Sequence, residues 1–317
     1  MPFSKAFDFA SGAIGDRFQN PFWKLKEFFF GSAIRNAVQE VKEFGASIVS
    51  TAVQKRCTAH DRKERQTVQK EMMPRTNLIN SLLDNIADHQ IVADAAMNYL
   101  SAGRDTTAQS LTWMFHCLLR NPAIVDSILS ELGRLPADSN GHPDLSFSAI
   151  QATSLPYLAA VFNESLRLFP PVPVELKECT AETVFPDGTA LPKGAVVIWV
   201  PWAMGRSKVI WGEDADTFRP IRWLDFNSEQ LISISAFEFP VFNGGPRACL
   251  GKKMAELLAV YVLGSLIWDY EFLEWNSKSS TESTPTEYRK SQNSLTLPME
   301  GGLPVKVRRR NALTKGG

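Results

Sequence analysis

The spacing of apolar residues along the chain predicts a mainly helical protein. Apolar positions recur at helical spacing from residue 21 to about residue 56, with interruptions at Gly31 and Gly45. A charged stretch with few apolar residues follows over residues 58–75 and is predicted to be an exposed connection between helices. Further helices are predicted over residues 88–119, 122–133, 154–168 and 250–269. Ser154 is expected to cap the third of these, with Pro156 in its first turn.

Strand patterns are few and short. Val184-Phe185, a turn at Pro186–Thr189 and the β-branched run Ala195–Val200 predict a hairpin-like sheet element. Residues 205–242 are rich in Gly, Pro and aromatic residues without periodicity, which predicts a long loop of the kind that usually carries function. Strand pieces are predicted to close the chain at residues 297–307. The predicted fold class is therefore mainly α with small β-sheets.

Composition and charge exclude several classes of function. The chain has 317 residues, 44% of them hydrophobic, with 34 basic and 34 acidic residues and a net charge of zero, so we expect no nucleic-acid partner. The longest nearly apolar stretch, Leu257–Trp268, is shorter than the roughly 20 residues that span a bilayer. No signal peptide is apparent, and the chain as given is expected to be cytosolic or peripheral.

The most specific motif is the segment Phe242-Asn-Gly-Gly-Pro-Arg-Ala-Cys-Leu-Gly251. Cys249 follows a glycine-rich turn and precedes a predicted helix, whose unpaired N–H groups and positive end stabilise a thiolate. Gly245 and Gly251 allow close approach to a flat partner, and Arg247 can pair with a carboxylate on that partner. A lone cysteine is more often a buried structural residue. The surrounding pattern instead favours a metal-ligand role.

This segment resembles the proximal loop of the cytochrome P450 superfamily, Phe-x-x-Gly-x-Arg-x-Cys-x-Gly. Its defined positions are Phe242, Gly245, Arg247, Cys249 and Gly251. The resemblance implies that Cys249 is the axial ligand of the iron in haem b (iron protoporphyrin IX) and that the other four residues help to bind this cofactor.

A second motif is Ala102-Gly-Arg-Asp105-Thr106-Thr in the long predicted helix. The Thr106 hydroxyl can bond the Ala102 carbonyl four residues earlier, and Gly103 lowers resistance to bending, so we expect the helix to open here. By resemblance, Asp105 and Thr106 are the catalytic pair that delivers protons during oxygen activation, and Ala102 and Gly103 lie beside the cofactor. The alternative is a helix that simply tolerates two threonines.

A third motif is Glu164-Ser-Leu-Arg167, an ion pair at helical spacing. The family resemblance adds Arg222 and implies a buried structural charge cluster of Glu164, Arg167 and Arg222. Ile221 occupies a position where many family members have glutamate, which predicts a weaker network. Glu131-Leu-Gly-Arg134 has the same spacing but falls at the end of a predicted helix, so we assign it no such role.

The resemblance covers the whole chain, which is similar to the later part of the family's fold only. Residues 1–317 are thus predicted to be one partial P450 domain that lacks the N-terminal part. It implies a monooxygenase that hydroxylates a lipophilic, fatty-acid- or alkane-like substrate with O2 and electrons from an NADPH-dependent reductase. The full-length form is expected at the endoplasmic reticulum membrane. Lys252 and Lys253 are candidates for meeting the reductase, and two solvated lysines are the alternative.

Two other functions stay open at this stage. The first is a truncated, non-catalytic relative that cannot hold haem stably and is an interaction protein or an incomplete gene product. The second, a haem sensor that does not activate oxygen, is disfavoured because it gives the Asp105-Thr106 pair no purpose.

Overall fold

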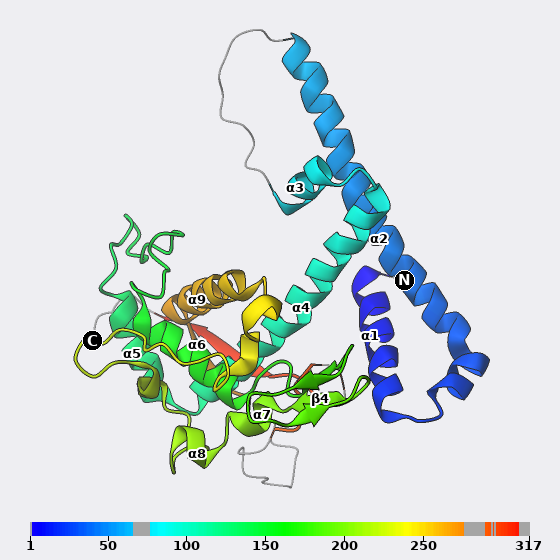
Figure 1. The fold of residues 1–317 in the computed structure, drawn as a ribbon. Coiled ribbons are helices and arrows are strands. Elements are labelled where there is room, and N and C mark those ends of the chain that lie inside the picture. The colour runs from blue at the N-terminus through cyan, green and yellow to red at the C-terminus, as the bar shows by residue number, and fades with distance from the viewer. Residues whose placement is uncertain (1, 66–76, 276–288, 293, 295, 311–317) are drawn as a thin grey trace. The chain divides into compact units, whose positions relative to one another are not determined.

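The computed structural model describes residues 2–65, 77–275, 289–292, 294 and 296–310 (Figure 1). Helices dominate these residues, as the sequence predicts. They are α1 (Phe3–Gln19), α2 (Trp23–Arg65), α3 (Leu78–Asn85), α4 (His89–Leu119), α5 (Pro122–Leu132), α6 (Pro156–Leu168), α7 (Pro201–Met204), α8 (Lys208–Trp211) and α9 (Lys252–Asp269). Short 3-10 helices are η1 (Pro220–Trp223), η2 (Pro240–Phe242) and η3 (Gly245–Arg247).

The chain divides into two compact units, the first within Met1–Arg104 and the second mainly within Asp105–Gln292 and Thr296–Gly317. In the first unit, α1 packs against α2 through the small buried residues Ala6, Ala10 and Ala37. Contrary to the predicted interruptions, α2 runs unbroken through Gly31 and Gly45. A Cβ atom at position 45 would lie 2.6 Å from the Met97 Cγ, so Gly45 serves close packing against α4.

The second unit is built around α6. This helix packs against α5, α9 and η1, and its residues from Leu158 to Leu168 are almost all buried. The last turns of α4 complete the core, where Met114 and Leu118 join Leu158 of α6 and Leu263 of α9. Buried apolar side chains of α4, α6 and α9 therefore fix the elements that carry the candidate site.

Three small antiparallel sheets also lie in the second unit. They pair β1 (Glu175–Glu178) with β4 (Val196–Trp199), β2 (Thr183–Val184) with β3 (Ala190–Leu191), and β5 (Tyr270–Glu274) with β6 (Val305–Arg309). The predicted hairpin was wrong in its pairing. Val184 lies opposite Ala190 of β3, and not opposite a residue of the 195–200 segment. The Asp187 carboxylate accepts the Thr189 N–H at 2.9 Å and closes the tighter β2–β3 turn.

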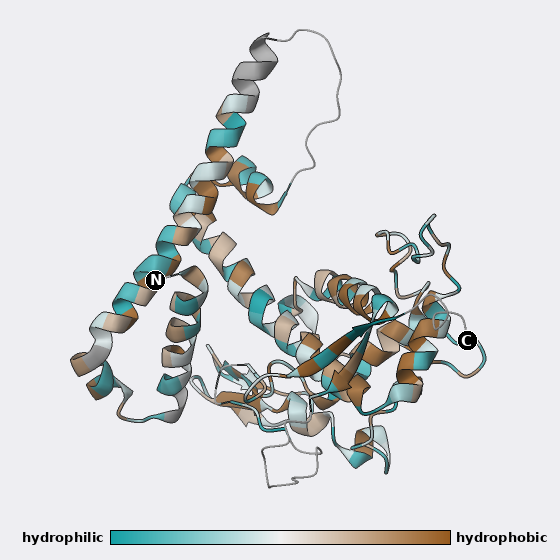
Figure 2. Cartoon of the chain, turned by 180° about the vertical axis from the view of Figure 1, so that it is seen from behind, coloured by the Kyte–Doolittle hydropathy of each residue, from teal (hydrophilic) through white to brown (hydrophobic). Residues whose placement is uncertain are grey.

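The longest helix, α2, carries polar and apolar residues interspersed along its length (Figure 2). Among the helices that the structure describes, none combines the length and the apolar character needed to cross a bilayer.

Candidate active site

Cys249 ends a loop that is fixed by its own backbone hydrogen bonds. The Cys249 N–H donates to the Phe242 carbonyl at 2.8 Å, and the Ala248 N–H donates to the Gly245 carbonyl at 3.1 Å. Gly245 has a φ of +62°, a left-handed conformation that glycine adopts without steric strain. The turn geometry therefore explains the glycine at this position of the motif.

The Cys249 thiol is exposed, three residues before the first residue of α9. The Lys252 N–H donates to the Cys249 carbonyl at 3.4 Å, which places the cysteine against the positive end of this 18-residue helix. The first turn of α9 contains no acidic residue. A Cβ atom on Gly251 would lie 3.8 Å from the Cys249 Sγ, an ordinary contact that leaves the sulfur accessible. An accessible sulfur in positive surroundings is the donor type that haem iron takes, so these residues fit haem.

Other residues of the loop anchor it to the second unit. Phe242 packs against the main core, which includes Met114 of α4 and Leu263 of α9. The Asn243 side-chain amide donates to the Glu175 carboxylate at 2.7 Å and ties the loop to β1, a contact that the sequence analysis missed. Arg247 is exposed and leaves its guanidinium accessible to a carboxylate.

The motif Ala102–Thr106 lies in α4. The predicted opening at Thr106 is not found, because α4 is continuous α-helix through residues 102–107. Asp105 and Thr106 are half-buried at the start of the second unit, while Ala102 and Gly103 belong to the end of the first. The Ser110 hydroxyl donates to the Thr106 carbonyl at 2.7 Å, so the same region carries a back-bonded hydroxyl that was not predicted.

The structure brings Glu164, Arg167 and Arg222 together. Glu164 and Arg167 have side chains with 0% exposure, and the Arg167 Nε and Nη2 atoms donate to the two Glu164 carboxylate oxygens at 2.8 and 2.9 Å. The Arg222 Nε donates to Glu164 Oε1 at 3.0 Å. The Trp223 indole N–H donates to Glu164 Oε2 at 2.9 Å, and the Arg219 backbone N–H donates to Glu164 Oε1 at 2.8 Å. The carboxylate therefore has five hydrogen-bond donors in a region without water access.

The remaining Arg167 donors bind backbone carbonyls. They reach Gly205, Ala215 at 2.5 Å and Thr217 at 3.0 Å. A Cβ atom at position 205 would lie 2.0 Å from the Arg167 carbonyl oxygen, so only glycine fits there. This packing holds the segment after α7 against the end of α6.

Ile221 has a side chain that is 57% exposed, and the donors to the Glu164 carboxylate in this segment come from Arg219, Arg222 and Trp223. The predicted weakening of the network at Ile221 stays a prediction. Arg222 reaches further to Asp214, with an Nη2–Oδ2 distance of 3.2 Å. Hydrogen bonding from Arg222 lowers the pKa of the Asp214 carboxyl.

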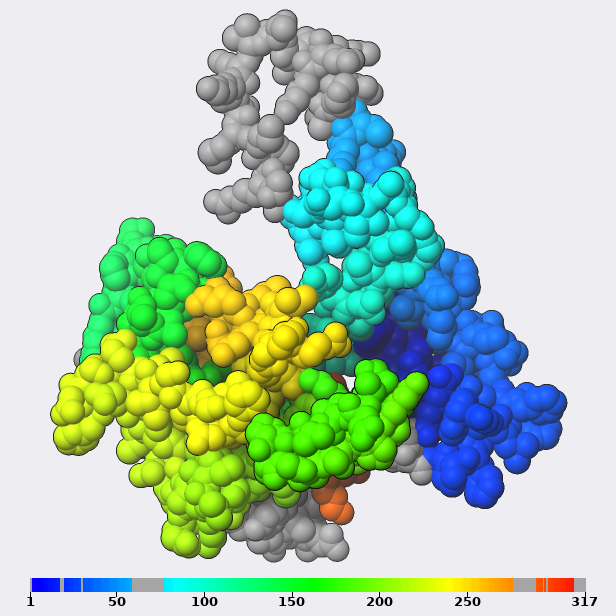
Figure 3. All heavy atoms as spheres, viewed as in Figure 1, coloured from blue at the N-terminus to red at the C-terminus, as the bar shows by residue number. Residues whose placement is uncertain are grey.

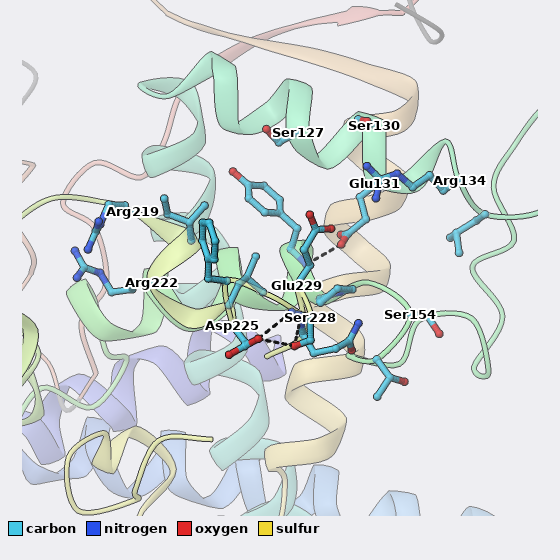
Figure 4. Close-up of a pocket in the computed structure, with 18 residues that line it drawn as sticks. Ser127, Ser130, Glu131, Arg134, Ser154, Arg219, Arg222, Asp225, Ser228 and Glu229 are labelled. Atoms are coloured by element: carbon cyan, nitrogen blue, oxygen red, sulfur yellow. Dashed lines mark hydrogen bonds between the residues drawn. The ribbon is translucent and has the colours of Figure 1, made fainter. Parts of the chain in front are cut away.

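Glu131 caps α6, a role that the sequence analysis missed. Its carboxylate accepts the backbone N–H groups of Tyr157 and Leu158 at 2.7 and 2.8 Å. The predicted Ser154 cap is wrong. Leu155 occupies the N-cap position of α6, and the Leu155 side chain makes no capping hydrogen bond. Glu131 lines a pocket of about 920 Å³, together with Arg134 and Glu229 (Figure 4).

The other cysteines lie in different surroundings. Burial raises the pKa of the Cys117 thiol to about 12, which makes it a packing residue. Cys57 is exposed on α2 and Cys179 is half-buried after β1. Across the part of the chain that the structure describes, no three His, Cys, Asp or Glu side chains gather as a metal site.

Comparison with known proteins agrees with the motifs. The cytochrome P450 family model matches residues 10–298. Cytochrome P450 94A1 of Vicia sativa is 30% identical over 321 residues, which cover 98% of this chain and 57% of that protein. Cytochrome P450 86B1 of Arabidopsis thaliana is 33% identical over 290 residues, which cover 86% of this chain and 50% of the relative. Noroxomaritidine synthase of a Narcissus is 30% identical, with 99% and 59% covered.

The chain thus spans 50–59% of the length of these curated relatives. Members of the family bind haem as their cofactor and are monooxygenases. The family match extends over the Cys249 loop, the buried charge cluster and α4 alike, and the chain belongs to the cytochrome P450 family.

Proposed function

We propose that this chain is part of a haem-dependent monooxygenase that hydroxylates a lipophilic substrate, fatty-acid-like or alkane-like. One oxygen atom of O2 enters a C–H bond of the substrate. The other leaves as water, after uptake of two electrons from an NADPH-dependent reductase and two protons. The observation that carries this proposal is the exposed Cys249 thiol on a hydrogen-bonded loop at the positive end of α9.

Cys249 would hold haem through its sulfur, and haem ligated by a thiolate supplies the oxygen-activating chemistry. The Phe242 carbonyl orients the Cys249 backbone, while the exposed Arg247 guanidinium is suited to a propionate. In this proposal the Thr106 hydroxyl of α4 holds a proton for the reaction, and the Asp105 carboxyl exchanges protons with water.

The buried charge cluster positions the loop. Glu164 and Arg167 connect α6 to the segment that leads from α7 through η1. Phe239, which follows that segment, packs against Trp223 with ring centroids 4.7 Å apart. A stable α6 therefore supports the residues that precede the Cys249 loop.

Lys252 and Lys253 at the start of α9 are proposed to meet the acidic surface of the reductase. The Lys252 side chain is 57% exposed, although its Nζ lies 3.9 Å from Glu256 and 5.7 Å from the Phe242 ring centroid. Lys252 and Lys253 follow the proposed ligand Cys249 by three and four residues, close to the place where electrons must arrive.

The experiment is a reconstituted turnover assay. Residues 1–317 loaded with haem are combined with an NADPH-dependent reductase and lauric acid as the probe, and hydroxylated product is measured against NADPH consumed. We expect Thr106→Ala to lower the ratio of product to NADPH, and Thr112→Ala, a hydroxyl further along α4 that bonds the Ala108 carbonyl, to leave it unchanged. Equal ratios for Thr106→Ala and the wild type would remove Thr106 from the proton relay.

A second candidate is a non-catalytic relative that does not hold haem and binds a protein partner. One observation favours it. Leu250, Met254, Leu258 and Tyr261 are 85, 60, 42 and 48% exposed at spacings of three and four residues, so one face of α9 and its leading residue is apolar and open. Product formation in the turnover assay excludes this candidate.

A further inference from the structure

The second unit contains a large pocket that the Cys249 loop does not line. It has a volume of about 960 Å³, enough to enclose a drug-sized molecule, and we call it the α6–α7 pocket after two of the helices that line it. Val174 and Val200, which flank β1 and β4, also line it, and these two strands lie at the surface of the second unit (Figure 3). None of the described residues 242–251 lines the pocket, so the proposed function gives it no role.

Aromatic rings line the α6–α7 pocket. Trp113 of α4 stacks on Phe169, with ring centroids 4.3 Å apart and an angle of 3° between the ring planes. Both rings contribute to the lining, together with those of His116 and Trp202. The Arg206 guanidinium lies 4.1 Å from the Trp202 ring centroid and 5.4 Å from that of Phe169. The pocket therefore offers flat apolar surfaces with a cation held against them.

His116 is a buried polar side chain that lines the pocket without a partner. It is 5% exposed, and its ring meets those of Trp113 and Phe169 edge-on, with centroids 5.7 and 6.3 Å apart. Within the described part of the chain, its ring nitrogens make no hydrogen bond. Burial and the positive charges of Arg120 and Arg289 lower the pKa of His116 to about 4, so the ring is neutral at pH 7 and has one N–H donor. An acceptor bound in the pocket would satisfy this donor.

The charged groups of the lining are mainly positive. They are Arg206, Arg289, Lys290 and Asp216, which give a net charge of 3 − 1 = +2 in a chain whose overall net charge is zero. The Arg206 guanidinium donates to the Leu168 carbonyl, and burial lowers its pKa to about 10. The carboxylate of Asp216 is 76% exposed and lies 3.9 Å from the Arg206 Nε, so it compensates this charge only weakly. The pocket therefore has positive charge available for an anion.

We propose that the α6–α7 pocket binds a small organic anion, with one carboxylate on an aromatic body. The carboxylate accepts the His116 N–H and lies close to the positive charges, while the aromatic body covers the rings of Trp113 and Trp202. A purely apolar ligand would leave the N–H donor and the positive charge unpaired. An inorganic anion would leave the aromatic surfaces uncovered. The combination of both features therefore favours an aromatic carboxylate.

The experiment is isothermal titration calorimetry of residues 1–317 with 2-naphthoate. The neutral analogue 2-naphthalenemethanol keeps the rings and loses the charge, so it should bind about tenfold more weakly, which is the contribution of one hydrogen bond to a charged group. Decanoate keeps the carboxylate without the aromatic body and should also bind more weakly. Cys249→Ala should bind 2-naphthoate like the wild type, because Cys249 does not line the pocket. This variant separates the pocket from the proposed function.

Two variants remove the groups that recognise the carboxylate. His116→Phe keeps an aromatic ring and removes the N–H donor, so its affinity for 2-naphthoate should fall about tenfold. Arg289→Gln/Lys290→Gln removes two exposed charges at about threefold each, so affinity should again fall about tenfold. The matched control is Lys193→Gln/Arg309→Gln, which removes one exposed lysine and one exposed arginine outside the lining and should bind like the wild type. Circular dichroism checks that every variant is folded.

Three results overturn the proposal. They are the absence of 2-naphthoate binding by the wild-type chain, equal affinities for 2-naphthoate and 2-naphthalenemethanol, and an equal loss in the Lys193→Gln/Arg309→Gln control and in Arg289→Gln/Lys290→Gln. Tighter binding of decanoate than of 2-naphthoate would contradict the aromatic part of the proposal. Binding of 2-naphthoate that Cys249→Ala abolishes would assign the ligand to the proposed haem site instead.

Discussion

Replacement of Glu164 by glutamine tests the buried charge cluster most sharply. The Glu164 carboxylate accepts two hydrogen bonds on Oε2, from Arg167 and Trp223, and three on Oε1, from Arg167, Arg219 and Arg222. Glutamine keeps one acceptor oxygen and places an NH2 group at the other position. That group then faces N–H donors, which cannot accept a hydrogen bond from it.

The magnitude follows from the burial of the partner. Arg167 is 0% exposed, so glutamine leaves its positive charge without a countercharge in a region closed to water. Loss of one partner from a buried ion pair costs about 3–5 kcal/mol, whereas the total free energy of unfolding of a domain is about 5–15 kcal/mol. We therefore expect Glu164→Gln to remove a large part of the stability of the second unit.

The assay is urea unfolding, monitored by tryptophan fluorescence. The control is Glu213→Gln, which breaks the Lys208–Glu213 pair, a contact of 2.9 Å between side chains that are 59 and 90% exposed. An exposed pair contributes about 0–1 kcal/mol, so the control should unfold near the wild-type midpoint. A midpoint for Glu164→Gln that matches this control would refute the reasoning.

Three further predictions test other parts of the structure. Gly205→Ala should lower the free energy of unfolding by about 3 kcal/mol or more, because the new Cβ would lie 2.0 Å from the Arg167 carbonyl oxygen. The control Gly12→Ala, which has open space around it in α1, should raise the free energy of unfolding by about 0.5–1 kcal/mol. A urea midpoint for Gly205→Ala equal to that of the wild type would contradict the packing. Glu131→Ala should cost about 1–2 kcal/mol through loss of the α6 cap, and Ser154→Ala should cost little; the reverse order would restore Ser154 as the cap. In the haem-free protein at pH 8, iodoacetamide should alkylate the exposed Cys57 and Cys249 and spare Cys117, because burial raises the pKa of the Cys117 thiol to about 12. Mass spectrometry of peptides measures the alkylation of each cysteine. Rapid alkylation of Cys117 would contradict its closed burial in the core.

The helices of the second unit could be predicted because their signals are local. The predicted helix over residues 88–119 agrees with α4 (His89–Leu119), and the structure confirms α5, which begins at Pro122. Proline in a first turn and a periodic apolar face act within a few residues of one another. Such signals are available in the sequence without knowledge of the fold.

Strand pairing could not be predicted in the same way. The β1 segment has the sequence Glu-Leu-Lys-Glu, which carries no apolar run, and it forms a strand only because β4 pairs with it in antiparallel register. The β5–β6 pair joins residues that are far apart in the sequence, from Glu274 opposite Val305 to Tyr270 opposite Arg309. Contacts at such separations depend on the tertiary fold.

The candidate site shows the same division. Motifs gave Cys249 and the Glu164–Arg167 pair, whose partners lie within one loop or one helical turn. Glu131 acts on a helix that starts 25 residues later, and Gly205 is required by a carbonyl 38 residues earlier. These two residues emerge only from packing, because no local pattern distinguishes them from an ordinary helix end and an ordinary turn.

The central claim is that Cys249 can hold haem in this chain, and the reduced carbon monoxide difference spectrum tests it most directly. Residues 1–317 are expressed with a haem supply, and the spectrum is compared with those of Cys249→Ala and of Cys57→Ala, a matched control that removes the other exposed thiol. The account predicts a thiolate-type Soret band in the wild type and in Cys57→Ala, and its loss in Cys249→Ala. Soluble wild-type protein without this band, or a band that persists in Cys249→Ala, would contradict the claim.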